Sequence, residues 1–154
     1  HDINTVLDIG CGTGAFGSVF KDRGYLVTGI DVAPEMVKRG LQNDLYCEKG
    51  DIKEGLSCPD NSYDMVVSAM VAHGLDEETR TKFFKETKRI SRKLVLIQDY
   101  KFENKFFVDL IERLEGGGYF NYIEKGEEQY LSVFDNLSKY EVSRNINWYI
   151  FKNK

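Results

Sequence analysis

A glycine-rich turn lies between a short apolar run and a helical pattern, all within the first 23 residues of the chain. The apolar run, Val6–Ile9, predicts a buried strand interrupted only by Asp8, and glycines follow at positions 10, 12 and 14. Residues 15–23 then have the pattern of a helix. Because glycine has no Cβ, the backbone can turn sharply there with positive φ, and a ligand can lie directly against it. The order strand, glycine turn, helix therefore predicts a ligand site beside the unpaired N–H groups of the helix start.

Two ligand-binding patterns share these residues. Residues 12–17 match G-x-G-x-x-G, the pattern of dinucleotide-binding turns. Residues 8–14 match D-x-G-x-G-x-G, which resembles the cofactor loop of class I S-adenosylmethionine-dependent methyltransferases. A tight turn without a ligand is a third interpretation, and residues further along the chain have to separate the three.

Short apolar strands and helical patterns alternate along the first hundred residues. The expected strands are Val6–Ile9, Tyr25–Asp31, Leu45–Glu48, Tyr63–Ala69 and Leu94–Asp99. The expected helices are Ala15–Arg23, a helix from Ala33 through Leu41, and Asp76–Arg92. This alternation is typical of a parallel sheet with helices on both faces.

The last third of the chain has a different pattern. Phe106–Leu114 predicts a helix, and a run of glycines breaks it. Tyr130–Phe134 and Val142–Phe151 read as two final strands joined by the turn Asp135–Ser138, and a link this short makes them antiparallel. The predicted fold is therefore α/β and doubly wound, with a mostly parallel seven-stranded sheet, an antiparallel C-terminal strand pair and helices on both faces.

In an open parallel sheet the ligand lies at the carboxyl ends of the strands, where the strand order reverses. Asp31 ends the second strand and stands 19 residues after Gly12, the spacing at which a carboxylate meets ribose hydroxyls. A helix N-cap or a turn residue is the alternative role for Asp31. Asp51 follows the third strand, and residues 68–73 follow the fourth.

Three features favour the methyltransferase resemblance over an NAD(P)-binding oxidoreductase. A buried Asp8 has to be paired; a sulfonium ligand with an ammonium group gives a reason for negative charge there, whereas a pyrophosphate would be repelled. The acid of Gly50-Asp51-Ile52 suits the adenine amino group. The final antiparallel strands resemble the end of the methyltransferase sheet, and no residues remain for the substrate domain that an NAD enzyme normally needs.

The resemblance covers residues 5–152 and implies S-adenosylmethionine as the cofactor. By this resemblance, Asp8 and the glycine loop would line the methionine part, Asp31 and Val32 the ribose and adenine, and Asp51 and Ile52 the adenine. The implied cofactor-binding set is Asp8, Gly10, Cys11, Gly12, Gly14, Asp31, Val32, Asp51, Ile52 and Ser68. Family members usually carry a helical segment before the first strand, so we expect a single domain, residues 1–154, that lacks this covering helix.

Methyl transfer from a sulfonium needs an in-line approach more than a fixed catalytic residue. His73, the only interior histidine, follows the fourth strand and is the candidate general base; a structural histidine is the alternative. Asp99 and Tyr100 follow the fifth strand and either face the acceptor or cap the turn. No metal site is expected.

The absence of two known motifs and the composition of the chain limit the classes of acceptor that we expect. Residues 68–71 lack the Asn/Asp-Pro-Pro-Tyr pattern of DNA and glutamine methylation and the Pro-Cys nucleophile of cytosine methylation. The net charge of −4 also argues against nucleic acid as a partner. We therefore expect a methyltransferase that acts on a small molecule. The alternatives are an NAD(P)-binding oxidoreductase domain and a non-catalytic cofactor-binding regulatory protein.

The remaining features predict an ordinary globular chain. No apolar stretch approaches the roughly 20 residues of a membrane span, and no signal peptide opens the chain. We therefore expect no membrane partner and a cytoplasmic location. Basic residues between Arg80 and Lys93 alternate with apolar ones at helical spacing, which predicts a solvated helix face.

Overall fold

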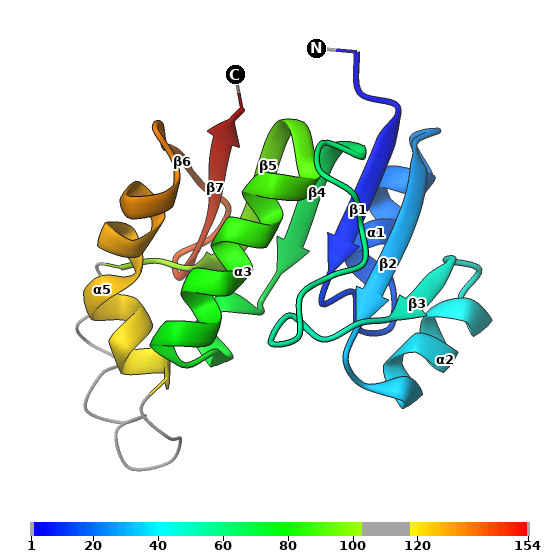
Figure 1. The fold of residues 1–154 in the computed structure, drawn as a ribbon, viewed down its shortest axis with the longest axis horizontal. Helices are drawn as coiled ribbons and strands as arrows, with labels where there is room; N and C mark the ends of the chain where they lie inside the picture. The colour runs from blue at the N-terminus through cyan, green and yellow to red at the C-terminus, as the bar shows by residue number, and fades with distance from the viewer. Residues whose placement is uncertain (1, 103–117, 154) are drawn as a thin grey trace.

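The computed structural model of the chain describes residues 2–102 and 118–153, which contain a seven-stranded sheet of order β3-β2-β1-β4-β5-β7-β6 (Figure 1). The strands β1 to β5 are parallel, and β7 runs antiparallel to both β5 and β6. The predicted fold class is confirmed. The strands are β1 (Thr5–Ile9), β2 (Leu26–Asp31), β3 (Cys47–Lys49), β4 (Tyr63–Ala69), β5 (Ser91–Tyr100), β6 (Ser138–Glu141) and β7 (Ile146–Lys152).

Helices cover both faces of this sheet, and Figure 1 shows α3 and α5 in front of it and α1 behind it. In the described ranges, no helix is long and apolar enough to cross a membrane. The helices are α1 (Ala15–Lys21), α2 (Pro34–Gln42), the short 3-10 helix η1 (Ala72–Gly74), α3 (Glu77–Ile90) and α5 (Gly118–Val133).

The alternation of side chains along β1 explains the two layers. Val6 belongs to a cluster that includes Phe16 and Phe20 of α1. Its neighbour Leu7 points to the opposite face and belongs to the larger core beneath α3 and α5. Successive side chains of a strand point to opposite faces, so a strand that is apolar at both positions has to be covered twice.

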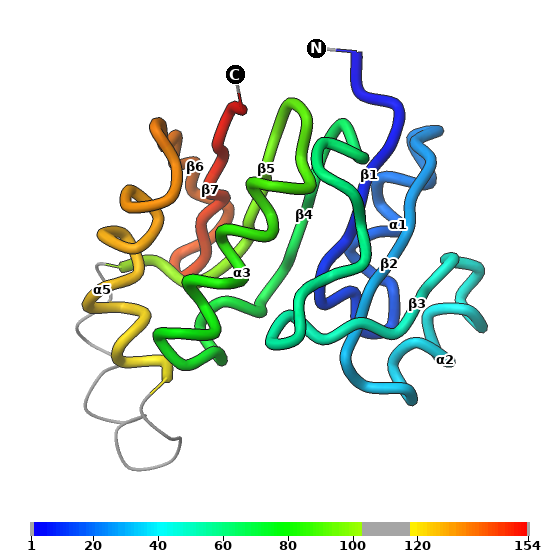
Figure 2. Tube along the Cα trace, viewed as in Figure 1, coloured from blue at the N-terminus to red at the C-terminus, as the bar shows by residue number. Residues whose placement is uncertain are grey.

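The connection from β3 to β4 contains no helix in the structure. Residues 50–62 form turns and bends, and Figure 2 shows this segment running across the front of β1 before it reaches β4. Its apolar side chains are not left exposed, because Leu56 is buried and Ile52 and Cys58 pack against the larger core.

The predicted strand Tyr130–Phe134 is wrong, because residues 118–133 form α5. Its buried residues recur at helical intervals: Tyr119, Tyr122, Ile123, Gly126, Gln129 and Tyr130. The edge strand β6 instead begins at Ser138, inside the stretch expected to be a turn. The predicted helix Phe106–Leu114 lies outside the described residues.

Gly126 lies inside this helix. Glycine is usually a poor helix residue, yet at this position a Cβ would lie 2.6 Å from Cε1 of Phe102 and 3.0 Å from the Tyr122 ring. The glycine therefore allows an aromatic ring to pack directly against the helix backbone. It does not mark an end of the helix.

The expected solvated basic face of α3 is wrong at Arg80, which is fully buried. Its guanidinium donates to the carbonyl oxygens of Leu75, at 3.0 Å, and Gly118, and to the side-chain oxygens of Gln129 and Asn121. Burial lowers the pKa of Arg80. The side chain thereby joins the residues before α3 to the first turn of α5.

We predict that Gly126→Ala destabilises the protein. The change would favour an unconstrained helix by about 1 kcal/mol, but overpacking a filled core costs about 1–3 kcal/mol. Urea unfolding should show a net loss, while Glu124→Ala, at an exposed position of α5, should change the free energy of unfolding by less than about 0.5 kcal/mol. A gain in stability for Gly126→Ala would contradict the packing described above.

Candidate functional site

A cavity of about 520 Å³ opens at the carboxyl ends of the parallel strands. It lies where the chain leaves β1 toward β2 on one side of the sheet and later returns to β4 on the other, the position at which open α/β sheets bind ligands. Five of the expected cofactor residues line it, namely Gly10, Asp31, Val32, Asp51 and Ile52.

Gly10, the first glycine of the loop after β1, lines this cavity. Gly10, Gly12 and Gly14 all have positive φ, at 74°, 54° and 86°. A Cβ on Gly10 would lie only 2.4 Å from Cγ2 of Val71, so the loop and the segment after β4 approach each other at this glycine. A Cβ on Gly14 would meet Leu45 at 3.0 Å, so this glycine serves the packing of α1 against the residues before β3.

Asp31 links the glycine loop to the end of β2. Its Oδ2 accepts a hydrogen bond from the Gly12 backbone N–H at 2.9 Å, and its Oδ1 accepts one from Ala33 N–H at 2.9 Å. A carboxylate oxygen has two lone pairs, so each oxygen keeps capacity for a ligand hydroxyl. Asp31 does not cap α2, whose N-cap is Ala33. Its bond to Ala33 N–H gives it the role of a turn residue, and this role is compatible with binding a ligand.

Asp51 and Ile52 come from the helix-free connection after β3. Asp51 Oδ1 accepts a hydrogen bond from the Lys53 backbone N–H at 2.8 Å, which closes a tight turn at the cavity wall. Ile52 and Leu56 supply the apolar part of the same wall.

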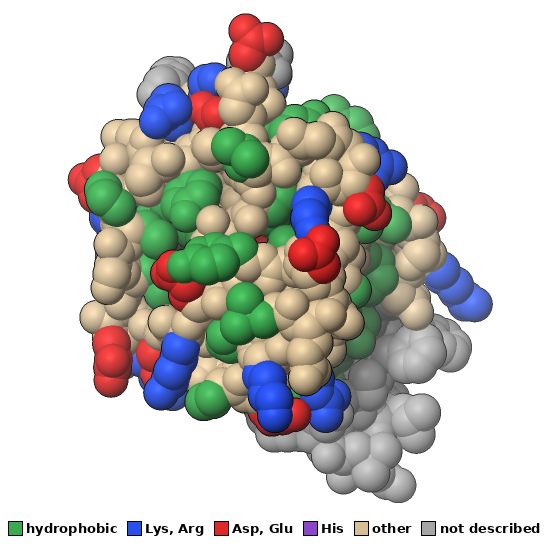
Figure 3. All heavy atoms as spheres, turned by 90° about the vertical axis from the view of Figure 1, so that its right-hand side faces the viewer, with side chains coloured by type: hydrophobic (Ala, Val, Ile, Leu, Met, Phe, Trp, Pro, Cys, Tyr) green, Lys and Arg blue, Asp and Glu red, His purple; other side chains and the backbone are tan. Residues whose placement is uncertain are grey.

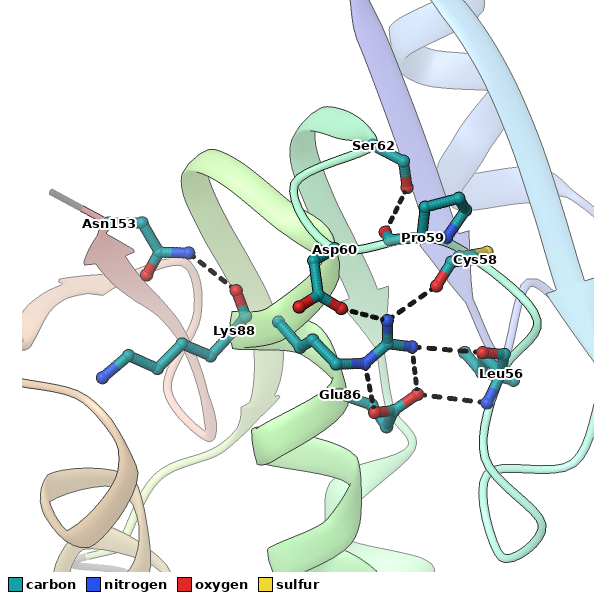
Figure 4. A network of polar contacts seen from close by, with 9 residues as sticks. Leu56, Cys58, Pro59, Asp60, Ser62, Glu86, Lys88 and Asn153 are labelled. Carbon is teal, nitrogen blue, oxygen red and sulfur yellow. Dashed lines mark hydrogen bonds and ion pairs between the residues drawn. The ribbon is translucent and has the colours of Figure 1, made fainter.

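A salt-bridge network holds this connection against α3, and Figure 4 shows Glu86 and Asp60 with the backbone of Leu56 and Cys58 around one guanidinium. That group belongs to Arg89, which forms a two-bond ion pair with Glu86 at 2.6 and 2.7 Å. It also donates to the carbonyl oxygens of Cys58 and Leu56, and Glu86 accepts from Leu56 N–H at 3.1 Å. The network takes the place of a helix in shaping this wall.

The other five expected cofactor residues do not line the cavity as far as the described residues define it, namely Asp8, Cys11, Gly12, Gly14 and Ser68. Cys11 points away from it, and its Sγ lies 3.6 Å from that of Cys47. Burial raises the pKa of the Cys11 thiol. Ser68 is buried and donates to the Ile9 carbonyl at 2.7 Å, which joins the ends of β4 and β1. Contact of these residues with a cofactor stays a prediction.

Asp8 is the most unusual of these residues. It is fully buried, and neither of its carboxylate oxygens has a hydrogen-bond partner among residues 2–102 and 118–153. Burial raises the pKa of Asp8 to about 7, which the approach of the Gly17 backbone N–H partly opposes and the charge of Asp31 reinforces. The carboxyl group is therefore close to half-protonated near neutral pH.

His73 lies beside the cavity, in η1. Its Nδ1 is 2.8 Å from Oδ1 of Asp99, whose side chain is fully buried at the end of β5. The structure thus brings together two residues that were predicted as separate candidates from the sequence. Among the described residues, no group of three or more His, Cys, Asp or Glu side chains is placed to hold a metal ion.

Much of the cavity wall was not anticipated from the sequence. Met70 adopts a φ of 58°, rare for a side chain of this size, while its N–H donates to the Gln98 carbonyl at 2.8 Å. Leu75 comes from the end of η1, and Thr79 and Phe83 come from the first two turns of α3. The sequence signal that could have predicted this part of the wall is the set of apolar residues directly after the fourth strand and on the first turns of the following helix.

Residues 6–93 match the family model described as a methyltransferase domain, so the chain belongs to the methyltransferase domain family. The family expected from the glycine loop is thereby confirmed. Two similar curated proteins are the 2-methyl-6-phytyl-1,4-hydroquinone methyltransferase of Synechocystis sp. and the 18S rRNA (guanine-N(7))-methyltransferase of Bos taurus. The first is 38% identical over 91 residues, 56% of this chain and 28% of that protein. The second is 35% identical over 65 residues, 41% of this chain and 23% of that protein.

Solved structures show the same fold over nearly the whole chain. A SAM-dependent methyltransferase from Aquifex aeolicus is similar with a TM-score of 0.70 and 23% identity, covering 97% of this chain and 81% of that one. The magnesium protoporphyrin IX methyltransferase of Synechocystis, solved with bound SAH, has a TM-score of 0.73 and 15% identity, covering 97% and 74%. By contrast, the chain spans only about a quarter of the length of the curated relatives above.

We predict that Asp8 makes the stability of the protein fall as pH rises from about 4 to about 7. The folded state holds the Asp8 proton up to a pKa of about 7, whereas the unfolded state releases it near 3.8. In that window the folded state binds more protons, so stability declines by about 1.4 kcal/mol for each pH unit. Urea unfolding at pH 5 and pH 8 should show this decline in the parent protein.

The matched variant for this prediction is Asp8→Asn, which has no proton to lose and should be more stable than the parent at pH 8. Asp64, held ionised by the Asn4 backbone N–H and by Lys93, has a lowered pKa and loses its stabilising effect only in more acidic solution. The two effects are therefore separable. An equal pH dependence in parent and Asp8→Asn would contradict the buried, unpartnered carboxyl group.

We also predict that Gly10→Ala costs more stability than Gly12→Ala. Both positions have positive φ and share a backbone cost of about 1–2 kcal/mol, but nothing lies within 4 Å of a Cβ on Gly12. The double variant Gly10→Ala/Val71→Ala should recover the difference, because Val71 supplies the close contact. Equal losses for the two single variants would mean that the loop and the segment after β4 do not touch.

Proposed function

We propose that the protein is a methyltransferase that binds S-adenosylmethionine in the 520 Å³ cavity. The observation that carries the proposal is the joint placement of Gly10, Asp31 and Asp51 on one cavity, in a chain of the methyltransferase domain family. SAM and SAH appear in the names of the similar structures from Aquifex aeolicus and Synechocystis.

The residues at this edge suit such a cofactor. Gly10 lines the cavity, Asp31 has free lone pairs for ribose hydroxyls, and Asp51 stands beside Ile52 and Val32 for the adenine. In its ionised form Asp8 supplies negative potential behind the loop, which favours a cationic ligand over a pyrophosphate. The sulfonium group would supply an already activated methyl carbon, so the chain's own task is positioning.

We propose a small-molecule acceptor. The net charge of −4 supports this, and Figure 3 shows acidic and basic side chains interspersed over the face at the β2–β3 edge. The names of similar proteins include a hydroquinone and a protoporphyrin methyltransferase, alongside rRNA and ribosomal-protein methyltransferases. We further propose His73 as the general base for an acceptor that has to lose a proton.

The proposal predicts that S-adenosylhomocysteine raises the melting temperature and that NADH does not. Saturation at a hundredfold excess over Kd corresponds to about 2.7 kcal/mol of stabilisation. Asp31→Asn should weaken binding at least about tenfold, because a charge-assisted hydrogen bond contributes about 1.5–3 kcal/mol. Calorimetry measures both affinities.

The control for that experiment is Asp22→Asn, which neutralises an exposed carboxylate at the end of α1 and should leave the affinity unchanged. Stabilisation by NADH without stabilisation by S-adenosylhomocysteine would overturn the proposed function. Unchanged affinity in Asp31→Asn would place the ribose elsewhere. A single domain over residues 1–154 and a cytoplasmic location stay predictions.

A further inference from the structure

The His73–Asp99 pair is partly buried and is held by several hydrogen bonds, unlike a chance contact at the surface. Asp99 is fully buried, whereas 22% of the His73 side chain is exposed. Asp99 Oδ1 lies 2.8 Å from His73 Nδ1 and also accepts from Tyr100 N–H at 2.8 Å, while Oδ2 accepts from His73 N–H at 3.3 Å. One buried carboxylate thus holds both the ring and the backbone of His73.

Two tyrosine rings restrict the imidazole further. The Tyr100 ring meets it edge-on at 4.8 Å between centroids, and the Tyr119 ring does so at 6.3 Å. The tyrosines pack against each other at 5.1 Å. With the ring held this way, a neutral His73 donates its Nδ1 proton to Asp99 and keeps a lone pair on Nε2. No described residue forms a hydrogen bond with Nε2.

His73 also lies next to the cavity, on the side away from Asp31 and Asp51, the two acids proposed to bind the adenosine part of the cofactor. Val71 and Leu75, two residues before and after it, both line the cavity. The strand order places η1, after β4, across the glycine loop from Asp31 and Asp51, which follow β2 and β3. A ligand extended from those acids over the glycine loop therefore ends at the His73 side.

We propose that Asp99 is a positioning residue that fixes His73 as a general base through Nε2, and that the acceptor of methyl transfer is consequently a hydroxyl group. This inference rests on the proposed function. In the step, the acceptor O–H proton passes to Nε2 and the oxygen bonds to the methyl carbon. The carbon–sulfur bond breaks with its electron pair to sulfur, which turns the sulfonium into a thioether. The imidazolium then returns its proton to solvent.

The surroundings of His73 favour this acceptor class over others. The groups facing it are the Asp99 carboxylate and the phenols of Tyr100 and Tyr119, while Arg80 on α3 is turned to backbone carbonyls. A fixed anion behind the ring stabilises the imidazolium that proton removal creates. A carboxylate acceptor has no proton to lose at neutral pH, and a neutral amine attacks without prior deprotonation, so neither needs the pair.

The first test needs no acceptor. The sequence contains two histidines, so His1→Gln leaves a single imidazole for ¹H–¹⁵N spectroscopy. At neutral to alkaline pH we expect the tautomer with its proton on Nδ1. In Asp99→Asn this preference should weaken, while Asp22→Asn should leave it unchanged. An Nε2-protonated tautomer in the parent protein would overturn the proposal even if S-adenosylhomocysteine binds.

The second test identifies the bond that is formed. The protein is incubated with tritium-methyl S-adenosylmethionine and a small-molecule cell extract. Label released by hot hydriodic acid but stable to dilute alkali indicates a methyl ether and supports the proposal. Label released as methanol by alkali indicates an ester, and an N-methyl product indicates an amine; either would overturn it.

The variants then separate catalysis from binding. His73→Ala should lower kcat by about 10²–10⁴-fold with unchanged affinity for S-adenosylhomocysteine. Asp99→Asn should lower kcat and shift the acidic limb of the pH–rate profile to lower pH, a change that a merely structural residue would not produce. Unchanged kcat in His73→Ala would overturn the base role. Loss of S-adenosylhomocysteine binding in the parent protein would instead be a failure of the proposed function.

Discussion

The hydrogen bond from the Gly12 backbone to Asp31 holds the glycine loop against the end of the neighbouring strand, and the rest of the site depends on it. The Gly10 N–H donates to the Ile30 carbonyl at 2.7 Å in the same region, so β2 fixes the loop at two points. With the loop held there, Gly10 meets Val71, and the two sides of the sheet close around one cavity. Without Asp31, the loop would lose its side-chain anchor and the cavity one of its acids.

Four carboxyl groups at this edge of the sheet lie in different environments, and this allows them different tasks. Asp31 and Asp51 accept backbone hydrogen bonds and face the cavity. Asp99 is buried but bonded to His73 and Tyr100. Asp8 is buried without a partner, so burial raises its pKa to about 7. A buried, unpaired charge opposes folding, which is the expected pattern at a binding site where stability and function compete.

The wall opposite the glycine loop depends on side chains far away in the sequence. The β3–β4 connection has no helix to stiffen it, and Arg89 of α3 binds its carbonyl oxygens while Glu86 binds its Leu56 N–H. Charge-assisted bonds of this kind are stronger than neutral ones. On the other side of α3, buried Arg80 binds the carbonyl oxygens of Leu75 and Gly118. One helix therefore positions both this cavity wall and the segment that follows His73.

The sequence by itself determined the features that depend on local pattern. Residues 6–9, the glycines and the alternation up to Asp99 predicted the parallel sheet, and parallel strands bring their carboxyl ends to one edge, so Asp31, Asp51 and His73 could be placed there. Only the tertiary structure decided the rest. A helix through Gly126 is favourable because Phe102 packs against it, a contact between distant segments. Arg80 is buried because α5 surrounds it, and His73 becomes a candidate base because β5 places Asp99 behind it. Such contacts join residues far apart in the chain, and no local spacing encodes them.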